Sequence, residues 1–437
     1  MNLILGNIVD NIHAKKVIKN LDKYILKAKE AKPLNAATVI SACDKLSSKL
    51  SEDDIKLLTD MGVPEYKAEQ EFKLLKLMLS KEYLENRLKT ELGTSETYEY
   101  EEEYKPYGYD VKVRHKFVPL GTLFHISAGN VELLAAFSII EGLLSGNINI
   151  VKLASSDDGL SVMLLKKLID IEPLLKSFIF VFDIASDDIK TLKKISCLSD
   201  AIVVWGSDET IKAARTFAGI NTRIIEWEHK ISFAYVSYDA KIEDIPDKEL
   251  YSLAYNICDT NQLFCNSCQG IMLDCTDFNE LKTFAKRFLT ILEEVAKNMP
   301  SELDIRIAAA KRLELYTERL ESLQNDDKSV FQGENVNVIV YKNQDLNSSY
   351  MFRNPWIKAL PKEQLLKALL PYKNYLQTVA LICPQSKRHE FEDILSKSGA
   401  VRICSGKNMS LNYCGMPHDG EFALRRYMKV MSYEVVS

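Results

Sequence analysis

Thr122–Leu153 reads TLFHISAGNVELLAAFSIIEGLLSGNINIVKL, and this stretch decides the class of fold. The apolar runs Thr122–Ile126 and Asn149–Leu153 are typical of buried strands, and Val131–Leu144 between them has the length and apolar content of a packed helix. A strand, a helix and a second strand in this order predict a βαβ unit, in which the two strands pair in parallel.

The same alternation of strand and helix continues as far as Ile225. The expected helices are Asp158–Ile169, Ser186–Lys194 and Asp208–Phe217, and the expected strands are Phe178–Phe182, Ala201–Trp205 and Arg223–Ile225. Because connections between parallel strands run over the sheet, helices should cover both of its faces. A nucleotide-binding domain is therefore the natural hypothesis for Phe117–Val236.

A second α/β series begins near Ser232. Its expected helices are Leu250–Cys258 and Glu280–Lys297, and its expected strands are Gly270–Leu273, Val336–Tyr341 and Thr378–Ile382. Gln324–Glu334 and Lys342–Asn354 are expected to be long loops. This series predicts a second domain.

The first part of the chain, up to about residue 90, has apolar residues at helical spacing, as in Val17–Ala28 and Glu69–Leu84. We predict that it is helical. Ser95–Asp110 follows with the sequence SETYEYEEEYKPYGYD, which is acidic and rich in tyrosine. A solvated connector is the favoured interpretation of this segment, and an edge ribbon or a partner-binding stretch are the alternatives.

The composition excludes several classes of protein. The chain has 437 residues, of which 27% are charged and 46% hydrophobic, and this is typical of a globular protein with two or three domains. A net charge of −5 disfavours nucleic-acid binding, and Val131–Leu144 is shorter than the about 20 residues of a membrane span. Nine scattered cysteines without a secretory signal predict reduced thiols and a cytoplasmic protein.

The turn Trp205–Glu209, with the sequence WGSDE, is a candidate phosphate site. An apolar strand passes through a glycine into a helix that begins with Ser and Asp, and free backbone N–H groups at such a helix start attract a phosphate. An ordinary helix start is the alternative. The sequence contains neither GxGxxG nor GxxxxGK[ST], so no nucleotide-binding motif supports this interpretation directly.

Cys265 is the candidate nucleophile. It lies in NQLFCNSCQ, Asn261–Gln269, immediately before an apolar strand, and a thiolate in such a place can accept an acyl group from a thioester. A buried structural cysteine is the alternative. Cys268 completes a CxxC, but no second CxxC or nearby pair of histidines completes a metal site, so we expect none.

Asn130 ends the segment His125–Asn130, HISAGN, where a predicted strand turns into a predicted helix. An asparagine at this point is equally well explained as a helix N-cap or as an amide that donates a hydrogen bond to an oxyanion.

Taken in order, these segments resemble the LuxC family of acyl-CoA reductases, a branch of the aldehyde dehydrogenase superfamily. The resemblance runs from about Pro119 to the C-terminus and is carried by FHISAGN (Phe124–Asn130), NINIVKLASSDD (Asn147–Asp158), NQLFCNSCQ (Asn261–Gln269) and PHDG (Pro417–Gly420). It implies an aldehyde dehydrogenase-like α/β fold. The expected parts are a helical N-terminal portion (1–95), a Rossmann-type NADPH-binding domain (96–231), a catalytic domain with the nucleophilic cysteine (232–414) and a C-terminal segment that returns to the cofactor domain or an oligomer interface (415–437).

The resemblance also implies roles for individual residues. Cys265 would be the nucleophile, and Asn130 with the backbone N–H of Cys265 would form the oxyanion hole. Glu226, in EWEHK, would stand where many aldehyde dehydrogenases place a general base. Because a reductase must avoid hydrolysis, Glu226 is expected only to handle a proton.

Four further residues are implied in cofactor binding. Lys152 would bind the adenosine ribose, and Gly206 and Ser207 would face the pyrophosphate. Ser155 stands where related NAD enzymes often have a glutamate that repels a 2′-phosphate, and this favours NADPH.

PHDG could place His418 near the active site, or the segment could be structural.

The resemblance implies NADPH-dependent reduction of a fatty acyl-CoA, or of an acyl group on an enzyme or carrier protein, to the aldehyde through an acyl-cysteine. Two alternatives stay open: a cofactor-independent acyltransferase or thioesterase that uses the same cysteine, and a non-catalytic acyl-binding subunit. The family suggests an acyl-activating synthetase as a partner and a homo-oligomer, either a dimer or a tetramer.

Overall fold

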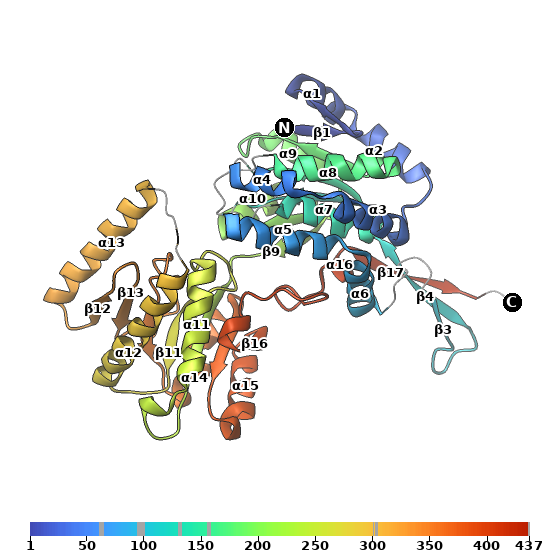
Figure 1. The fold of residues 1–437 in the computed structure, drawn as a ribbon. Coiled ribbons are helices and arrows are strands. Elements are labelled where there is room, and N and C mark those ends of the chain that lie inside the picture. The colour runs from blue at the N-terminus through green and yellow to red at the C-terminus, as the bar shows by residue number, and fades with distance from the viewer. Residues whose placement is uncertain are drawn as a thin grey trace. The chain divides into compact units, whose positions relative to one another are not determined.

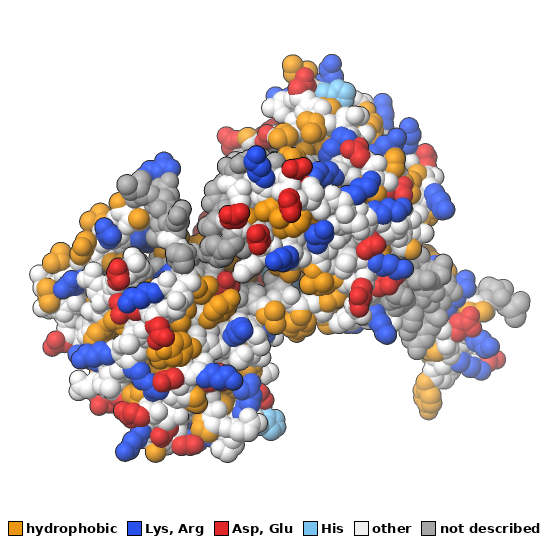
Figure 2. Space-filling view, viewed as in Figure 1, with side chains coloured by type: hydrophobic (Ala, Val, Ile, Leu, Met, Phe, Trp, Pro, Cys, Tyr) orange, Lys and Arg blue, Asp and Glu red, His pale blue; other side chains and the backbone are white. Residues whose placement is uncertain are grey.

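In the computed structural model of the chain, the residues described are 1–60, 65–93, 101–129, 133–154, 159–299, 301 and 305–435. The chain divides into two units (Figure 1). The first unit consists of Met1–Glu228 together with Tyr413–Ser437, and the second consists of His229–Asn412. Lysine, arginine, aspartate and glutamate side chains are interspersed over the face shown in Figure 2. Among the described residues, no helix is both long enough and apolar enough to cross a membrane.

The described part of the first unit has a sheet with the strand order β2-β1-β7-β6-β5-β8-β9. Its strands are β1 (Asn2–Ile4), β2 (Asn7–Val9), β5 (Thr122–Ile126), β6 (Ile148–Lys152), β7 (Ile179–Phe182), β8 (Ala201–Trp205) and β9 (Arg223–Trp227). The strands β5 to β9 run parallel, and nearly every side chain of β5, β6 and β7 is buried because helices cover both faces. The predicted parallel sheet is therefore confirmed.

The hairpin of β1 and β2 corrects the prediction that the chain begins as a helix. Strand β1 pairs antiparallel with β7 and so extends the sheet, and Leu5 and Gly6 between the two strands have φ angles of 48° and 80°. Two consecutive positive φ values are the requirement of a type I′ two-residue hairpin turn, and Gly6 provides one of them without strain.

The N-terminal helices follow the predicted pattern but are more numerous. They are α1 (Asn11–Lys19), α2 (Leu21–Glu30), α3 (Ala36–Lys49), α4 (Glu52–Asp60), α5 (Glu65–Leu79) and α6 (Lys81–Leu92). The predicted helical segments Val17–Ala28 and Glu69–Leu84 are each divided, at Asn20 and at Ser80. Ser80 ends one helix and caps the next, since its hydroxyl accepts a hydrogen bond from the backbone N–H of Tyr83 (3.4 Å).

The helices that cover the parallel sheet are α7 (Leu134–Leu144), α8 (Leu160–Ile171), α9 (Ile189–Cys197) and α10 (Asp208–Phe217), with a 3-10 turn at Pro173–Ser177. Each lies within a few residues of its predicted position. Their buried apolar side chains join those of α1 to α6 in one core with the sheet, so the N-terminal helices belong to the first unit.

A separate three-stranded antiparallel sheet has the order β17-β4-β3 and consists of β3 (Glu101–Tyr104), β4 (Val113–Pro119) and β17 (Met428–Glu434). The expectation of a solvated connector at Ser95–Asp110 is therefore wrong for Glu101–Tyr104, which form an edge strand. Backbone pairing with β4 outweighs the acidic composition here. Residues 94–100 lie outside the described part of the chain.

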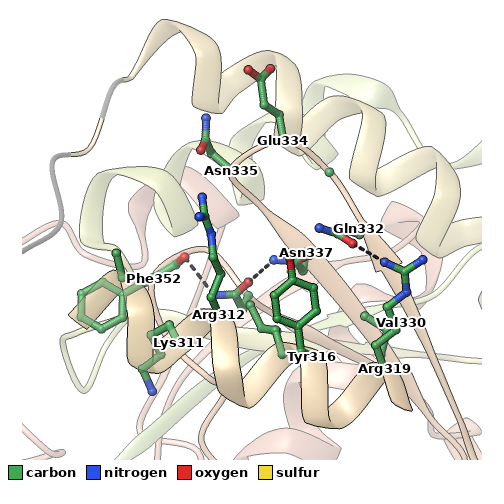
Figure 3. A pocket seen from close by; sticks show the side chains of 14 residues that line it. Lys311, Arg312, Tyr316, Arg319, Val330, Gln332, Glu334, Asn335, Asn337 and Phe352 are labelled. Carbon is green, nitrogen blue, oxygen red and sulfur yellow. Dashed lines mark hydrogen bonds between the residues drawn. The ribbon is translucent and has the colours of Figure 1, made fainter. Parts of the chain in front are cut away.

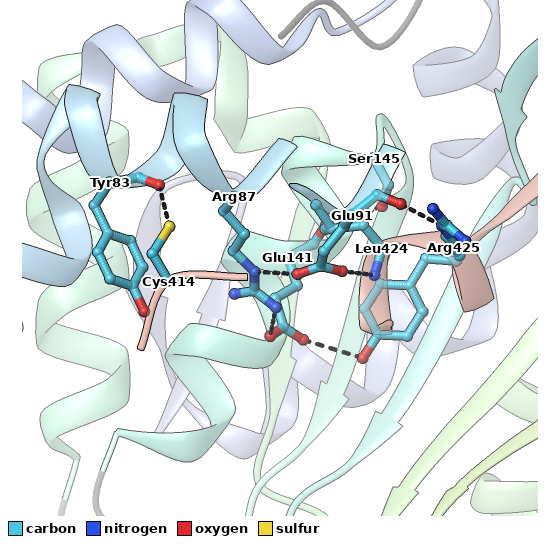
Figure 4. A network of polar contacts seen from close by, with 9 residues as sticks. Tyr83, Arg87, Glu91, Glu141, Ser145, Cys414, Leu424 and Arg425 are labelled. Atoms are coloured by element: carbon cyan, nitrogen blue, oxygen red, sulfur yellow. Dashed lines mark hydrogen bonds and ion pairs between the residues drawn. The ribbon is translucent and has the colours of Figure 1, made fainter. Parts of the chain in front are cut away.

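Charged side chains that are buried or partly buried in the first unit hold its C-terminal segment in place (Figure 4). Arg87 of α6 donates to Glu91 and to Glu141 of α7, each at 2.6 Å. Glu91 also accepts a hydrogen bond from the backbone N–H of Leu424, in the short helix α16 (Ala423–Arg426), at 2.9 Å. Tyr427 donates its hydroxyl hydrogen to Glu141 (3.3 Å). Burial acts to lower the pKa of Arg87, but the two carboxylates outweigh it and raise that pKa, so the guanidinium stays charged.

The described part of the second unit has a sheet with the order β12-β13-β14-β11-β10-β15-β16, parallel except for the β12–β13 pair. The strands are β10 (Ile231–Val236), β11 (Cys268–Leu273), β12 (Lys328–Gln332), β13 (Asn337–Tyr341), β14 (Trp356–Ala359), β15 (Leu376–Ile382) and β16 (Arg402–Cys404). The helices are α11 (Asp247–Thr260), α12 (Phe278–Asn298), α13 (Ile305–Gln324), α14 (Lys362–Leu369) and α15 (Arg388–Lys397), with 3-10 turns at Ile242–Asp244, Leu370–Tyr372, Gln385–Lys387 and Gly406–Asn408.

The two predicted loops of the second unit have different outcomes. Lys342–Asn354 contains neither helix nor strand, as predicted. Gln324–Glu334 was predicted to be a loop, and this is wrong, because Lys328–Gln332 forms β12 and pairs antiparallel with β13. The strand is short and its side chains are only partly buried, so it lacks the apolar signal of a central strand.

Candidate active site

Cys265 lies on a tight turn between α11 and β11 in the second unit. Asn261 and Gln262, which end α11, both have left-handed backbone conformations, with φ of 47° and 61°. The turn is closed by two hydrogen bonds, from Phe264 N to Ser267 Oγ (3.1 Å) and from Ser267 N to Phe264 O (3.0 Å). The turn holds Cys265 partly exposed at the amino end of β11.

The sulfur of Cys265 accepts a hydrogen bond from Nε2 of Gln377, at 3.3 Å. Gln377 is buried on β15, next to Thr378. The carbonyl of Cys265 accepts from the hydroxyl of Ser232 on β10 (2.7 Å), and that hydroxyl in turn accepts from Thr378 N (3.0 Å). Because a thiolate accepts hydrogen bonds more strongly than a thiol, the amide of Gln377 favours the nucleophilic form of Cys265.

Gln262 fixes the base of the turn. Its buried side-chain amide donates to the carbonyls of Cys268 (2.9 Å) and Gln269 (3.2 Å), and its Oε1 accepts from Asn354 N (2.9 Å). Buried amides that satisfy several backbone groups rigidify the segment that they connect. Gln262 therefore couples the Cys265 turn to Asn354.

Cys268 lies in a different environment from Cys265. Its side chain is fully buried, its thiol donates to the carbonyl of Gly270 (3.3 Å), and burial raises its pKa to about 12. A thiol with so high a pKa stays protonated at neutral pH and is a poor nucleophile or metal ligand. All nine cysteines are free of disulfide bonds.

Glu226 lies on β9 in the first unit and forms a two-pronged ion pair with Arg215 of α10. The distances are 2.6 Å from Nε to Oε1 and 2.7 Å from Nη2 to Oε2. Only 16% of the Glu226 side chain is exposed. Both carboxylate oxygens of Glu226 are therefore engaged by the guanidinium of Arg215.

Lys152 is buried at the carboxyl end of β6, and its Nζ donates to the hydroxyl of Ser186 at 2.8 Å. Burial lowers the pKa of Lys152, and Asp183 opposes this effect. Asp183 and Ser186 follow β7, which pairs with β6. Lys152 therefore lies at the carboxyl edge of the parallel sheet, where ligands of such sheets bind.

Gly206 and Ser207 form the turn from β8 into α10 at the same edge. Gly206 has φ of 152°, and a Cβ atom at this position would lie only 3.1 Å from the Cβ of Thr210. Ser207 precedes the helix without capping its backbone N–H groups, and its hydroxyl bonds to the carboxylate of Glu209, which lowers the pKa of that group. A close turn that leads from a strand into the N-terminus of a helix fits a phosphate-bearing cofactor.

His125 and His418 both lie in the first unit and differ in their surroundings. His125 is buried and contacts Ser138 Oγ (2.7 Å) and Asn149 Oδ1 (3.0 Å), and burial lowers its pKa to about 4. His418 packs against the rings of Trp205 and Trp227, with centroid distances of 5.3 and 5.0 Å. His418 of PHDG is thus held beside the residue that precedes Gly206.

The predicted site residues Asn130 and Ser155 lie outside the described residues. Of the other predicted residues, Glu226, Lys152, Gly206 and Ser207 belong to the first unit and Cys265 to the second.

A family model described as acyl-CoA reductase (LuxC) matches residues 32–430. The chain belongs to the LuxC family of acyl-CoA reductases. This confirms the predicted family.

Curated relatives are named long-chain acyl-protein thioester reductases. One from Photobacterium leiognathi is 27% identical over 330 residues, which cover 73% of this chain and 65% of the relative. Another from Vibrio harveyi is 24% identical and covers 86% of this chain and 76% of the relative. The chain thus matches just under two thirds of the length of the first of these LuxC relatives.

Solved aldehyde dehydrogenases share the fold of this LuxC family member. Aldehyde dehydrogenase 21 from Physcomitrella patens has a TM-score of 0.71 at 12% identity and covers 98% of this chain and 91% of its own. A glyceraldehyde-3-phosphate dehydrogenase from Methanocaldococcus jannaschii, solved with NADP, has a TM-score of 0.70 at 14% identity and covers 98% of this chain and 95% of its own. The predicted aldehyde dehydrogenase-like fold is confirmed.

Sequence analysis missed three residues that contact the predicted ones: Gln262, Gln377 and Arg215. Gln262 lies inside the quoted motif NQLFCNSCQ, and its position in the motif was the available signal. Gln377 is 112 residues from Cys265 in the chain, and nothing in the local sequence marks it. Arg215 lies on the surface of α10, an ordinary amphipathic helix, and nothing in its sequence distinguishes this arginine from other exposed ones.

Proposed function

We propose that this protein reduces a long-chain acyl thioester to the aldehyde through an acyl-cysteine formed on Cys265. The observation that carries the proposal is the hydrogen bond from Gln377 to the sulfur of Cys265, on a partly exposed turn of a LuxC family member. The names of the relatives support an acyl group on a protein as the donor, and acyl-CoA is the simpler donor of the same chemistry.

In the first step, the Cys265 thiolate attacks the thioester carbonyl. A bond forms between sulfur and the carbonyl carbon, the donor's carbon–sulfur bond breaks, and the donor leaves as a thiol after taking up a proton. Gln377 orients the sulfur, and Ser232 fixes the backbone of Cys265 through its carbonyl. The backbone N–H of Cys265 and the amide of Asn130 are proposed to stabilise the oxyanion.

Lys152, Gly206, Ser207 and Ser155 are proposed to hold a nicotinamide cofactor, with NADPH favoured by the serine at position 155. When bound, the reduced nicotinamide supplies the hydride that makes an aldehyde from the acyl-cysteine. The Cys265 sulfur leaves the reduced carbon as a thiolate, ready for another acyl group. Buried Lys152 and the close turn at Gly206 support a binding site at this sheet edge.

The ion pair of Glu226 supports reduction rather than hydrolysis. To activate water as a base, the Glu226 carboxylate would have to give up two short hydrogen bonds with Arg215. We therefore propose that Glu226 at most relays a proton.

Intact-mass measurement after mixing with hexadecanoyl-CoA tests the proposal. Wild type should gain one hexadecanoyl group, Cys265→Ala should gain none, and Cys197→Ser, which removes an exposed thiol, should behave like wild type. Addition of NADPH should then release hexadecanal. An adduct that persists in Cys265→Ala would remove this residue from its role, and acylation without nicotinamide oxidation would indicate an acyltransferase or thioesterase.

A further inference from the structure

Helix α13 of the second unit leaves a row of large apolar side chains in solvent. Leu313, Tyr316, Leu320 and Leu323 are exposed by 69, 52, 64 and 78%. Their spacing of three, four and three residues places them on one face of the helix, and hydrophobic side chains reach the surface along α13 (Figure 2). A contiguous apolar row of this kind marks an interaction surface more often than single exposed leucines do.

The acidic and the basic side chains of α13 differ in whether they have partners of opposite charge. Its acidic residues have cations within the same unit: Glu314 accepts from Lys311 (2.7 Å), and Lys328 donates to Glu318 (2.7 Å) and Glu321 (2.5 Å).

Two arginines beside the apolar row pair with no carboxylate among the described residues. Arg319 donates to the neutral amide of Gln332 (2.7 Å), and Arg312 has no hydrogen bond or ion pair with any described residue. Within the described part of the chain, the row is therefore flanked by guanidinium groups that pair with no carboxylate, and this suits an acidic partner.

A pocket of about 160 Å³ lies between α13 and the segment before β14 (Figure 3). Arg312, Tyr316 and Arg319 line the pocket from α13, and Phe352 and Asn354 line it from the segment before β14.

Phe352 and Asn354 also hold the residues that lead into the Cys265 turn. Phe352 N donates to Asn261 O (2.8 Å), and Asn354 N donates to Gln262 Oε1 (2.9 Å). Met351, Phe352 and Arg353 all have positive φ angles, of 57°, 47° and 70°. Three such non-glycine residues in succession are strained, and strain of this kind is retained where the surrounding structure holds it for a function.

We propose that α13 is the docking face for an acidic protein that carries the acyl thioester, with Leu313, Tyr316, Leu320 and Leu323 as the apolar contact and Arg312 and Arg319 as its basic edge. This inference rests on the proposed function. A second copy of the chain fits less well, because self-pairing would bring arginine against arginine or against carboxylates that already have partners.

The docked donor reacts with Cys265 by thioester exchange. The donor's carbon–sulfur bond breaks, the bond to Cys265 forms, and the proton of the Cys265 thiol passes to the donor's sulfur. No atom is oxidised or reduced in this step, so acylation can be measured without a nicotinamide.

The test compares two hexadecanoyl donors, an acidic acyl carrier protein and CoA, in single-turnover acylation of Cys265 followed by intact mass. The variants are Leu313→Gln/Leu320→Gln and Arg312→Glu/Arg319→Glu. Exposed residues of α14 provide matched controls, Leu366→Gln and Lys367→Glu. We expect the α13 variants to slow acylation by the carrier protein by roughly tenfold and leave acylation by CoA within about twofold. The arginine variant should also lose the salt dependence of the carrier reaction.

The possible outcomes separate the two proposals. If neither donor acylates wild type, the proposed function fails and the docking face with it. If CoA acylates wild type and the carrier protein does not, the docking proposal is overturned while the function stands. The docking proposal would likewise be overturned if the α13 variants slowed acylation equally with both donors. It would also be overturned if these variants left both acylation rates unchanged and altered the oligomeric mass of the protein.

Discussion

Replacement of Gln377 by leucine tests how the protein activates its cysteine. Leucine has a similar volume and fills the buried position, but it removes the amide that donates to the Cys265 sulfur at 3.3 Å. A hydrogen bond to a charged group contributes about 1.5 to 3 kcal/mol. Cys265 is partly exposed, so water replaces part of the loss and the lower end of this range applies.

At about 1.4 kcal/mol for each factor of ten, Gln377→Leu should slow the attack of Cys265 roughly tenfold at neutral pH. Gln377→Glu should be slower still, because a carboxylate beside the sulfur repels the thiolate. The measurement is the second-order rate of iodoacetamide alkylation at Cys265, read from the labelled peptide and corrected with Cys265→Ala. Acylation by hexadecanoyl-CoA should follow the same order.

Thermal unfolding serves as the control, since the variants must keep the wild-type fold for the rates to be compared. Alkylation and acylation of Gln377→Leu within about twofold of wild type, with unchanged unfolding, would refute the assignment of Gln377 as a positioning residue.

Two further predictions concern the first unit. In Gly206→Ala, the added methyl group would lie 3.1 Å from Thr210, on a backbone with a φ of 152°. We therefore expect the affinity for NADPH, measured by fluorescence titration, to fall about tenfold or more. An unchanged affinity would contradict a cofactor at this turn. His125 has a pKa of about 4 when folded and about 6.5 when unfolded, so the unfolded state alone gains a proton between these values. The first unit should therefore lose up to about 3 kcal/mol of unfolding free energy as the pH falls from 6.5 to 4. Urea titrations over this pH range should show a smaller loss for His125→Gln. Identical losses in the variant and in wild type would exclude His125 as the cause.

The sequence predicted those elements whose signal is local. The strands and helices between Thr122 and Trp227 repeat a strong pattern of short apolar runs and amphipathic helices, and the parallel sheet follows from it. Strands β1 and β12 were missed because each is short, and their pairing with β7 and β13 decides their structure rather than their own composition. Helix α13 was not predicted either. It carries apolar side chains on its solvent side, so its sequence does not show the single apolar face that marks an amphipathic helix.

The candidate site divides in the same way. Cys265 and Gly206 lie in motifs that can be read directly, whereas Gln377 reaches Cys265 only through the pairing of β10 and β15. The pairing of Glu226 with Arg215 depends on how α10 packs beside β9, and no spacing in the sequence gives it.

The buried charges around Arg87 also constrain the order in which the protein can assemble during synthesis. Glu91 is 1% exposed and depends on Arg87 and on the backbone of Leu424, which the ribosome makes more than three hundred residues later. Until that late segment emerges, Glu91 lacks the backbone N–H of Leu424, and Glu141 lacks the hydroxyl of Tyr427. The second unit is one uninterrupted stretch, so it can fold while the first still waits for its last helix and strand.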